Sequence, residues 1–438
     1  MDSTSPRSFR YPTVIAVVIA NMVGTGVFTS LGFQLLEIQS GFVLLALWAV
    51  GGVIALCGAM TYAELGAALP RSGGEYNFLA RIYHPAAGFV SGWVSATIGF
   101  AGPTALAAMT FAAYATSTAG VAHLPWLREG LAVGLIVLLA AAHATSHRTS
   151  GGTQRLFTIL KVAIIVVFCV AALAVVDVGQ PIRFLPSAGD AGLVFSGKFA
   201  VALIYVSYAY TGWNAATYLS GELDEPQRTL PIVLTAGTLF VMVLYLALNY
   251  TFLEVAPVAA MRGQVEVGYV AASFAFGETA GRLMGMVLAA LLISTVSAML
   301  VAGPRVLQVI GEDFRAFEWL ARKNRSGIPA LAVGLQALLA IVFVLSGSFE
   351  SVLVFAGFTL ALNSFVTVFG LFVLRVREPD LPRPYRTFGY PVTPLVYLGI
   401  TGWTLVFVLI NRPVEGLFGL GVIASGLLMY GVVGVRDS

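Results

Sequence analysis

Charged side chains are scarce in this sequence. Of its 438 residues, 24 are Lys or Arg and 21 are Asp or Glu, whereas 58% are hydrophobic. With a mean hydropathy of +0.89, the chain has too few charges to cover the surface of a water-soluble protein of this size. The composition therefore predicts an integral membrane protein that crosses the bilayer several times.

The small net charge of +3 also limits the partners of the chain. Its basic residues are spread over several connections and are interleaved with acids, unlike the basic patch of a nucleic-acid-binding protein. We therefore exclude nucleic acid as a partner.

Cysteine and histidine are rare too. Cys57 and Cys169 both fall inside apolar runs, where a thiol usually behaves as a small apolar group, so we predict no disulfide, no metal site and no cofactor. An enzyme acting within the bilayer would need a nucleophile and a base, or paired acids, inside these runs. The sequence has no HExxH or GxSxG pattern, and its four histidines fall in connections or at the ends of the runs, which argues against catalysis.

Apolar runs of about 20 residues are long enough to cross about 30 Å of hydrocarbon as helices. The sequence has twelve such runs, which predicts an all-α polytopic membrane protein with twelve transmembrane helices. A cleaved signal peptide is not expected, because no small-residue cleavage pattern follows the first run. The predicted spans begin near Pro12, Phe42, Gly88, Gly130, Gln154, Gly197, Thr229, Thr279, Pro329, Phe349, Thr393 and Val414.

The distribution of Lys and Arg orients these spans. If both termini are cytoplasmic, 18 of the 24 basic residues fall on the cytoplasmic side and six fall on the outer side. Cytoplasmic connections collect Lys and Arg, so this bias favours a chain with both termini inside the cell. The six outer residues are Arg128, Arg183, Lys198, Arg262, Arg282 and Arg412.

Two predicted spans are interrupted near their middle. Gly24, Thr25 and Gly26 break the first span within "ANMVGTGVFTSLGF", and Thr211 and Gly212 break the sixth within "YVSYAYTGWNAATYLSGEL". Glycine is a poor helix former, although it also lets neighbouring membrane helices approach closely. Five spans separate the two breaks, and an odd number means that the second unit is inverted relative to the first. Paired breaks of this kind indicate a transporter site near the bilayer midplane.

An interrupted helix exposes backbone groups that a regular helix would satisfy. The freed N–H groups from Val23 to Gly26 can bind a carboxylate, helped by the dipole of the following half helix. The freed carbonyls around Tyr208 to Thr211 can bind an ammonium group. An α-amino acid carries both groups, and a side chain at Gly24 or Gly26 would fill the space of its carboxylate. Irregular backbone is tolerated in a membrane where it lines a cavity, so the breaks predict an amino acid site.

Five segments together resemble one family of transporters. "VGTGVF" at 23–28 is similar to the glycine signature of helix 1 in the amino acid/polyamine/organocation (APC) superfamily, and "AYTGWN" at 209–214 resembles the helix 6 signature of its L-type amino acid transporter branch. The other three are "YAELGAALPRSGGEY" at 62–76, "GELDEPQRTLP" at 221–231 and "REPDLPRPYRTFGYPVTP" at 377–394. They occur in the order and at the spacing of the family, and the resemblance covers nearly the whole chain.

The resemblance implies a single membrane transporter domain over residues 1–438. It would contain an inverted repeat of five plus five helices at 12–177 and 197–376, followed by two further helices at 393–436. It also implies an amino acid bound between helices 1 and 6 and moved by alternating access. The residues that the resemblance places at the substrate are Val23, Gly24, Thr25, Gly26, Val27, Phe28, Tyr208, Ala209, Tyr210, Thr211, Gly212, Trp213 and Asn214.

Individual positions of the second signature have different implied roles. Tyr208 stands where the family closes an aromatic ring over the substrate, and Trp213 and Asn214 would hold the unwound segment in shape. Ordinary aromatic packing is the alternative for Tyr208, Tyr210 and Trp213. Thr211 departs from the glycine or aspartate often found at its position, which leaves the shape of the side-chain pocket open.

One cation falls inside a predicted span. Lys161, in "LFTILKVAIIVVFCV", lies about 10 Å deep, where an ionisable residue is a functional candidate, although a lysine can also snorkel to the interface. "FTILK" resembles the helix 5 segment where sodium-independent members of the family carry a lysine in place of a sodium ion. Its ammonium would face helix 1 carbonyls and the hydroxyls of Ser294, Thr295 and Ser297. Lys161 either carries a proton, which gives symport, or acts as a fixed strut, which is compatible with exchange or facilitated uptake.

The remaining charges are expected in cytoplasmic connections, some in ion pairs of an inner gate and most solvated, Glu64 and Glu75 among them. Without an obvious acid inside a span, a neutral amino acid is the expected substrate. A polyamine or other organic amine is the alternative within the same fold, and an amino-acid-permeable channel is the alternative from another class.

The outer loop between the third and fourth spans indicates whether a protein partner can be linked to this chain by a disulfide. Eukaryotic relatives of the L-type branch pair with a glycoprotein through a cysteine in this loop, whereas "AGVAHLPWLRE" at 119–129 has none. No covalent glycoprotein partner is therefore expected. The short tails and the missing cysteine favour a bacterial inner membrane.

Overall fold

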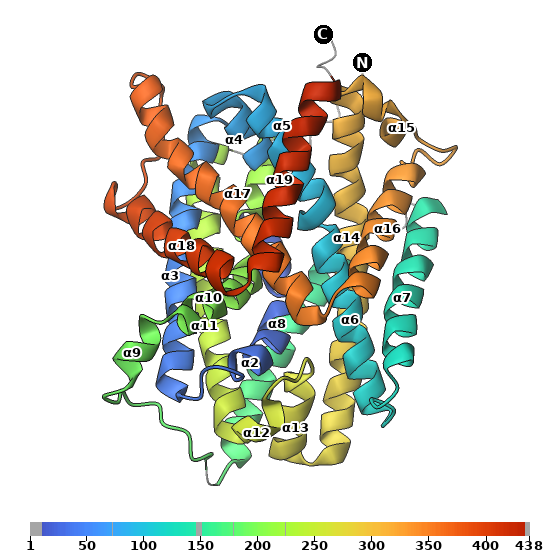
Figure 1. Ribbon diagram of the computed structural model, residues 1–438, viewed down its shortest axis with the longest axis vertical. Coiled ribbons are helices and arrows are strands. Elements are labelled where there is room, and N and C mark those ends of the chain that lie inside the picture. Colours follow the sequence, from blue (N-terminus) through green and yellow to red (C-terminus); the bar gives the residue numbers. More distant parts are fainter. Residues whose placement is uncertain (1–10, 72, 146–150, 178, 224, 434–438) are drawn as a thin grey trace.

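The computed structural model describes residues 11–71, 73–145, 151–177, 179–223 and 225–433, without the side chains of 12, 13, 151–155 and 219–222. Every secondary-structure element within these ranges is a helix (Figure 1). Helices suit a bilayer because their backbone hydrogen bonds are satisfied without water, and the predicted all-α fold class is confirmed. The N and C labels lie at the same end of the molecule in Figure 1.

The helices follow the chain in two groups. Up to residue 194 they are α1 (Tyr11–Met22), α2 (Gly26–Gln34), α3 (Gly41–Ala68), α4 (Glu75–Ile82), α5 (Pro85–Val94), the π-helix η1 (Ser95–Gly99), α6 (Ala101–Thr118), α7 (Pro125–Thr145), α8 (Gly151–Val175) and α9 (Asp190–Val194). From residue 197 they are α10 (Gly197–Tyr210), the 3-10 helix η2 (Ala215–Glu222), α11 (Pro226–Val255), α12 (Val258–Met261), α13 (Val267–Phe276), α14 (Glu278–Asp313), the 3-10 helix η3 (Arg315–Phe317), α15 (Glu318–Ala321), α16 (Ala330–Ser346), α17 (Phe349–Arg377), α18 (Val392–Asn411) and α19 (Pro413–Val433).

Ten helical segments of the described chain are long and apolar enough to cross a membrane. Each of the twelve predicted spans has its helix, although the helices of the sixth and the ninth have fewer than 18 residues. α10 has 14 residues because it ends at the second break, and α16 has 17. The expected polytopic membrane protein is therefore confirmed, and the sixth helix ends at the interruption that the sequence predicted.

Four spans begin three or more residues earlier than predicted: α8 begins at Gly151, and the other three each begin at a proline. α5, α7 and α11 start at Pro85, Pro125 and Pro226, three to five residues before the predicted positions. Proline is favoured at the first position of a helix, because its ring fixes φ at a helical value and its missing N–H would be unpaired there anyway. Assigning these prolines to the preceding loops shortened the predicted helices.

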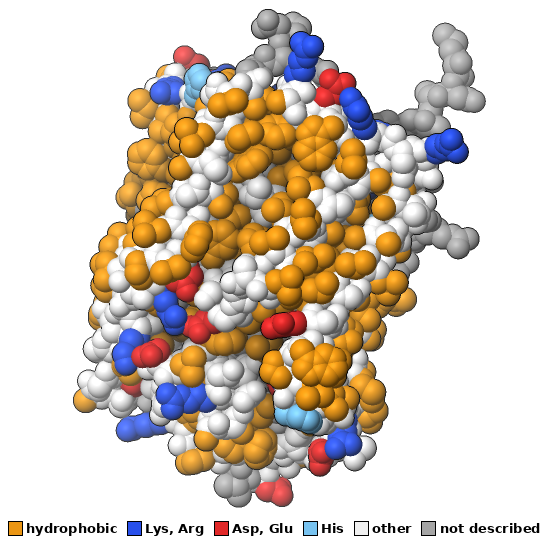
Figure 2. All heavy atoms as spheres, turned by 45° about the vertical axis from the view of Figure 1, so that its right-hand side comes forward, with side chains coloured by type: hydrophobic (Ala, Val, Ile, Leu, Met, Phe, Trp, Pro, Cys, Tyr) orange, Lys and Arg blue, Asp and Glu red, His pale blue; other side chains and the backbone are white. Residues whose placement is uncertain are grey.

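The outer surface has the apolar character of a lipid-facing protein. A broad hydrophobic band lies between charged groups near the upper end of Figure 2 and a second set of charges in its lower half. Large apolar side chains point outward along the outer helices, including Leu138 of α7 at 67% exposed, Val170 of α8 at 66% and Leu428 of α19 at 71%. Lipid chains can cover these side chains at no hydrophobic cost, which is consistent with a multi-pass membrane protein.

The two helices next to the breaks run in opposite directions. Gly26 at the start of α2 packs against Ala209 near the end of α10, so closely that a Cβ on Gly26 would lie 2.5 Å from the Ala209 Cα. At the other end of the pair, Glu37, just beyond α2, forms a 2.9 Å ion pair with Lys198 at the start of α10. The antiparallel arrangement brings the two breaks to the same depth of the bundle.

One acid expected in a cytoplasmic connection is buried instead. The Glu64 side chain, in α3, is 0% exposed and accepts two hydrogen bonds from Arg375, at 2.9 and 2.7 Å, and two from Thr387, both at 2.7 Å. Arg383 lies 3.6 Å from the same carboxylate, and Arg375 also stacks on the ring of Tyr390. Glu64 therefore fastens the 378–391 connection to α3 through an ion pair, as expected for some of these charges, but it lies in a helix and not in a connection.

Candidate substrate-binding site

The first break frees three adjacent backbone donors. The Val23 N–H still bonds the carbonyl of Ile19 at 2.8 Å, but the N–H groups of Thr25, Gly26 and Val27 donate no hydrogen bond within the described chain. They stand at the start of α2, where the helix dipole is positive. Unpaired amides at such a helix start form a site for an anion such as a carboxylate.

The second break leaves two carbonyls free. α10 ends at Tyr210, and the N–H and hydroxyl of Thr211 both bond the Tyr208 carbonyl, at 3.0 and 2.6 Å. Gly212 then adopts a φ of +101°, which turns the chain into η2. The Tyr208 carbonyl is thus already paired. The Ala209 carbonyl is paired as well, because it accepts a hydrogen bond from the Tyr245 hydroxyl. Among the described residues, the carbonyls of Tyr210 and Thr211 accept no hydrogen bond and can receive a cation.

Both breaks line one cavity of about 300 Å³. Its walls come from α1, α2 and α10 and, on the opposite side, from η1, α6, α14 and α17. The volume is at the lower end of the range typical of small-molecule sites. Nine of the thirteen predicted substrate residues line it: Gly24, Thr25, Gly26, Tyr208, Ala209, Thr211, Gly212, Trp213 and Asn214.

The other four predicted substrate residues do not line this cavity. The Val23 carbonyl accepts a hydrogen bond from Nζ of Lys161, and the Val27 side chain is fully buried. Phe28 lines a separate apolar cavity, and its carbonyl accepts a bond from the Tyr114 hydroxyl at 3.3 Å. The Tyr210 ring points toward α3, where its hydroxyl bonds a backbone carbonyl. One face of each half helix packs into the bundle, which explains why consecutive residues cannot all reach the substrate.

Two of the three glycines at the breaks are required by close helix packing, which the sequence did not predict. A Cβ on Gly24 would meet only the Met22 carbonyl, at 3.9 Å, and would project into open space beside the cavity. A Cβ on Gly26 would collide with Ala209 of α10, and one on Gly212 would lie 2.7 Å from the backbone of Asn21. The expectation that a side chain at Gly26 would displace the substrate is therefore wrong, because it would first displace α10.

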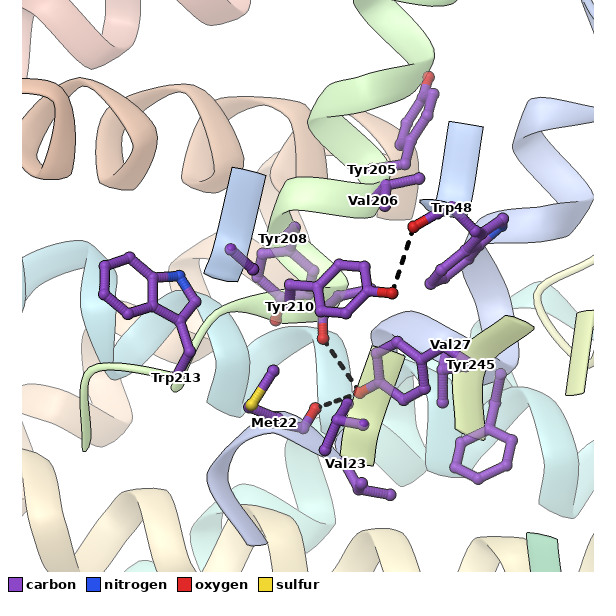
Figure 3. Packing of buried hydrophobic residues seen from close by; sticks show 14 of the residues in the cluster. Met22, Val23, Val27, Trp48, Tyr205, Val206, Tyr208, Tyr210, Trp213 and Tyr245 are labelled. Atoms are coloured by element: carbon purple, nitrogen blue, oxygen red, sulfur yellow. Dashed lines mark hydrogen bonds between the residues drawn. The ribbon is translucent and has the colours of Figure 1, made fainter. Parts of the chain in front are cut away.

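A buried tyrosine joins the two breaks. The Tyr245 hydroxyl, on α11, lies 2.6 Å from the Met22 carbonyl at the end of α1 and 3.1 Å from the Ala209 carbonyl near the end of α10 (Figure 3). The Tyr245 ring is fully buried between Trp48 and Tyr210, with ring centroids 5.5 and 5.0 Å away. One side chain thus holds the relative position of both interrupted helices.

We expect Tyr245→Phe to loosen this junction. The change leaves the buried Ala209 carbonyl without a donor, which typically costs about 1–3 kcal/mol, and it leaves the Met22 carbonyl with the Gly24 N–H alone, at 2.8 Å. The expected result is a lower melting temperature of the detergent-purified protein together with weaker apparent affinity for substrate. Tyr250→Phe is the matched control, because Tyr250 lies on the same helix and is 37% exposed. Equal melting temperatures and affinities in the two variants would contradict the assigned role of Tyr245.

Lys161 lies inside the bundle. Its side chain, on α8, is 6% exposed, and Nζ donates to the Val23 carbonyl at 3.3 Å and to the Thr295 hydroxyl at 2.9 Å. A snorkelling lysine would instead extend to the membrane surface. Lys161 therefore connects α8 with the first break and with α14.

The three hydroxyls predicted to face Lys161 do not lie together. Only Thr295 contacts it, whereas the Ser297 hydroxyl lies 2.8 Å from Nε2 of His143 on α7. Residues two positions apart on a helix differ in direction by about 200°, since each residue turns the helix by about 100°. Ser297 thus points to the opposite side of α14, and Ser294 makes no hydrogen bond to Lys161. The prediction is wrong for Ser294 and Ser297.

Three features of the cavity were not predicted from the sequence. The third span contains the π-helix η1, whose Ser95 and Gly99 line the cavity, and π-helical turns often mark functional sites. Asn363 of α17 also lines it. Glu75, assigned to a solvated loop, is 3% exposed and lines it as well. The only signal for Glu75 was its place in the "RSGGEY" part of the resemblance.

A cavity between two interrupted helices, inside a bundle of apolar spans, defines the class of secondary transporters. The family model for amino acid permease matches residues 9–432, and the chain belongs to this family. It is therefore an amino acid transporter and not an enzyme, as predicted.

Two similar proteins are also amino acid transporters, which supports this assignment. The b(0,+)-type amino acid transporter 1 of Mus musculus is 24% identical over 427 residues, covering 95% of this chain and 85% of the relative. The large neutral amino acids transporter small subunit 2 of Homo sapiens is 28% identical over 431 residues, covering 94% of this chain and 78% of the relative. The predicted resemblance to L-type transporters of the APC superfamily is confirmed.

Proposed function

We propose that this protein carries neutral amino acids across the membrane by alternating access, without sodium, and with the substrate bound between the two breaks. The observation that carries the proposal is the single cavity lined by the free amides at the start of α2 and by the end of α10. Donors and acceptors at the two breaks match the two charged ends of an α-amino acid.

The substrate carboxylate would bind the N–H groups of Thr25 and Gly26, beside the open space at Gly24. The ammonium would bind the free carbonyls of Tyr210 and Thr211. Charge-assisted hydrogen bonds of this kind are about twice as strong as neutral ones. Backbone binding leaves the substrate side chain free to extend along the cavity toward Tyr208 and α17.

Lys161 supports the proposed sodium independence. Its ammonium already occupies the space between the Val23 carbonyl and the Thr295 hydroxyl, two oxygens that a cation would otherwise coordinate. A second cation at this position would face the repulsion of a buried charge. Lys161 either exchanges a proton during the cycle, which gives symport, or remains a fixed strut, which is compatible with exchange or facilitated uptake.

The remaining parts of the proposal concern architecture and location. We infer that 12–177 and 197–376 are inverted repeats, as the opposite directions of α2 and α10 suggest, and that 393–436 adds two helices. The excess of Lys and Arg favours both termini in the cytoplasm, and the inner membrane of a bacterium is the proposed location. The chain is proposed to act without a covalently linked glycoprotein.

Uptake of a panel of radiolabelled amino acids into proteoliposomes tests this function. We expect saturable, stereoselective uptake of neutral amino acids that does not change when sodium is replaced by choline. Stimulation by an inward proton gradient would indicate symport, and stimulation by amino acid loaded inside would indicate exchange. Uptake of amines alone would favour the organic amine alternative, and non-saturable uptake would favour a channel.

A further inference from the structure

Glu75 is a buried acid at the wall of the substrate cavity. It is the first residue of α4 and follows Gly73 and Gly74, whose φ angles of +121° and +53° turn the chain toward the bundle. The side chain is 3% exposed and lines the same cavity as the two breaks. The turn places a carboxylate where the sequence pattern suggested a solvated loop.

Three neutral groups hold the Glu75 carboxylate in place. The Tyr62 hydroxyl donates to Oε1 at 2.9 Å, the Asn214 amide donates to Oε1 at 2.7 Å, and the Tyr218 hydroxyl donates to Oε2. Asn214 and Tyr218 follow the second break, so the acid is attached to the segment that binds the substrate. None of these donors carries a positive charge.

No cation in the described structure compensates Glu75. The buried acid Glu64 pairs with Arg375, and the buried acid Glu266 pairs with Arg128, but Glu75 forms no ion pair among the described residues. It is also the one charged side chain among the described residues that line the cavity. A single uncompensated charge that is itself shielded from solvent acts strongly on a ligand beside it, because the surrounding dielectric is low.

We propose that Glu75 selects substrates by the charge of their side chain. Its carboxylate disfavours amino acids with an anionic side chain and accepts a cationic side chain in addition to neutral ones. The inference rests on the proposed function and widens its substrate class. The expectation of neutral substrates assumed that no acid faces the site, and Glu75 removes that assumption.

A purely structural role is the competing explanation. Glu75 could simply anchor Asn214 and Tyr218, in which case its removal would weaken every substrate to a similar extent. Charge selection predicts a different result, because the effect must change sign between cationic and anionic side chains. The two explanations therefore separate when substrates of equal shape and different charge are compared.

The experiment measures competition against uptake of a radiolabelled neutral amino acid in proteoliposomes, with two matched pairs of competitors. Glutamate and glutamine have nearly the same shape, as do lysine and norleucine, and each pair differs in side-chain charge. For Glu75→Gln, we expect the preference for glutamine over glutamate to fall by about tenfold, and the preference for norleucine over lysine to rise by about tenfold. Glu75→Asp keeps the charge and should keep both preferences close to those of the unchanged protein.

Tyr218→Phe separates the charge from the hydrogen bonds. It removes one donor but leaves the carboxylate, so both preferences should keep the direction seen in the unchanged protein. If Glu75→Gln weakens all four competitors by the same factor, or changes none of them, the charge-selecting role is wrong. Uptake of the neutral amino acid by the unchanged protein is the internal check on the proposed function, because its absence would overturn that function separately.

Discussion

Gly26→Val is expected to abolish transport. A Cβ at this position would lie 2.5 Å from the Cα and 2.7 Å from the Cβ of Ala209, and the valine methyl groups would add to the collision. Neither group is a flexible side-chain end, so α2 and α10 would have to move apart. Separation would displace the free amides of the first break from the carbonyls of the second, and the site depends on their proximity.

Two alanine substitutions control for the presence of a new side chain. A Cβ on Gly334 of α16 meets nothing within 4 Å, so Gly334→Ala should transport normally. A Cβ on Gly24 meets only a carbonyl at 3.9 Å, so Gly24→Ala should fold normally but weaken substrate binding. Melting temperature and uptake, measured on the same purified samples, distinguish these results. Normal transport by Gly26→Val would show that the two breaks do not need to be in contact.

Lys161→Ala is expected to reduce uptake by about tenfold or more, since hydrogen bonds to a charged group each contribute about 1.5–3 kcal/mol. The change removes the ammonium that links α8 to the Val23 carbonyl and to Thr295. Lys161→Met keeps most of the side-chain volume without the charge, so loss of uptake in both variants assigns the effect to the ammonium. Lys198→Ala is the control for removing a lysine, because its ion pair with Glu37 is more than half exposed and contributes little.

The transport that remains in Lys161→Met distinguishes a proton-carrying role of the lysine from a role as a fixed strut. If Lys161 carries the proton, stimulation by an inward proton gradient disappears in the variant while exchange of amino acids persists. If Lys161 is a fixed strut, uptake and exchange fall together and any dependence on the gradient is unchanged. Unreduced uptake by both Lys161 variants would contradict both roles.

The sequence predicted the parts of the fold that depend on local composition. Apolar runs placed a helix at every predicted span, and Gly24, Gly26 and Gly212 marked both interruptions because glycine weakens a helix wherever it occurs. Four helix starts were predicted three or more residues too late, three of them where a proline opens the helix. The π-helical turn in the third span was missed, since no single residue type specifies it.

The site was less predictable where it depends on contacts between distant segments. Tyr245 lies in an apolar run that resembles any lipid-facing stretch, and only the packed structure brings it to the carbonyls of Met22 and Ala209. Ser297 was assigned to the wrong side of α14 because a run of hydroxyl residues does not show which of them faces α8. Glu75 was misassigned because its burial depends on two glycine turns and on donors from α3 and η2.

Recognition of both ends of an amino acid at the two breaks is most directly tested by displacement of radiolabelled leucine from the purified protein. The competitors are leucine, 3-methylbutylamine, which lacks the carboxylate, and 4-methylpentanoate, which lacks the ammonium. We predict that each analogue binds at least about tenfold more weakly than leucine, because each leaves one charged end unrecognised. If either analogue displaced radiolabelled leucine at the same concentration as leucine itself, a site built from the amides of α2 and the carbonyls of α10 would be contradicted.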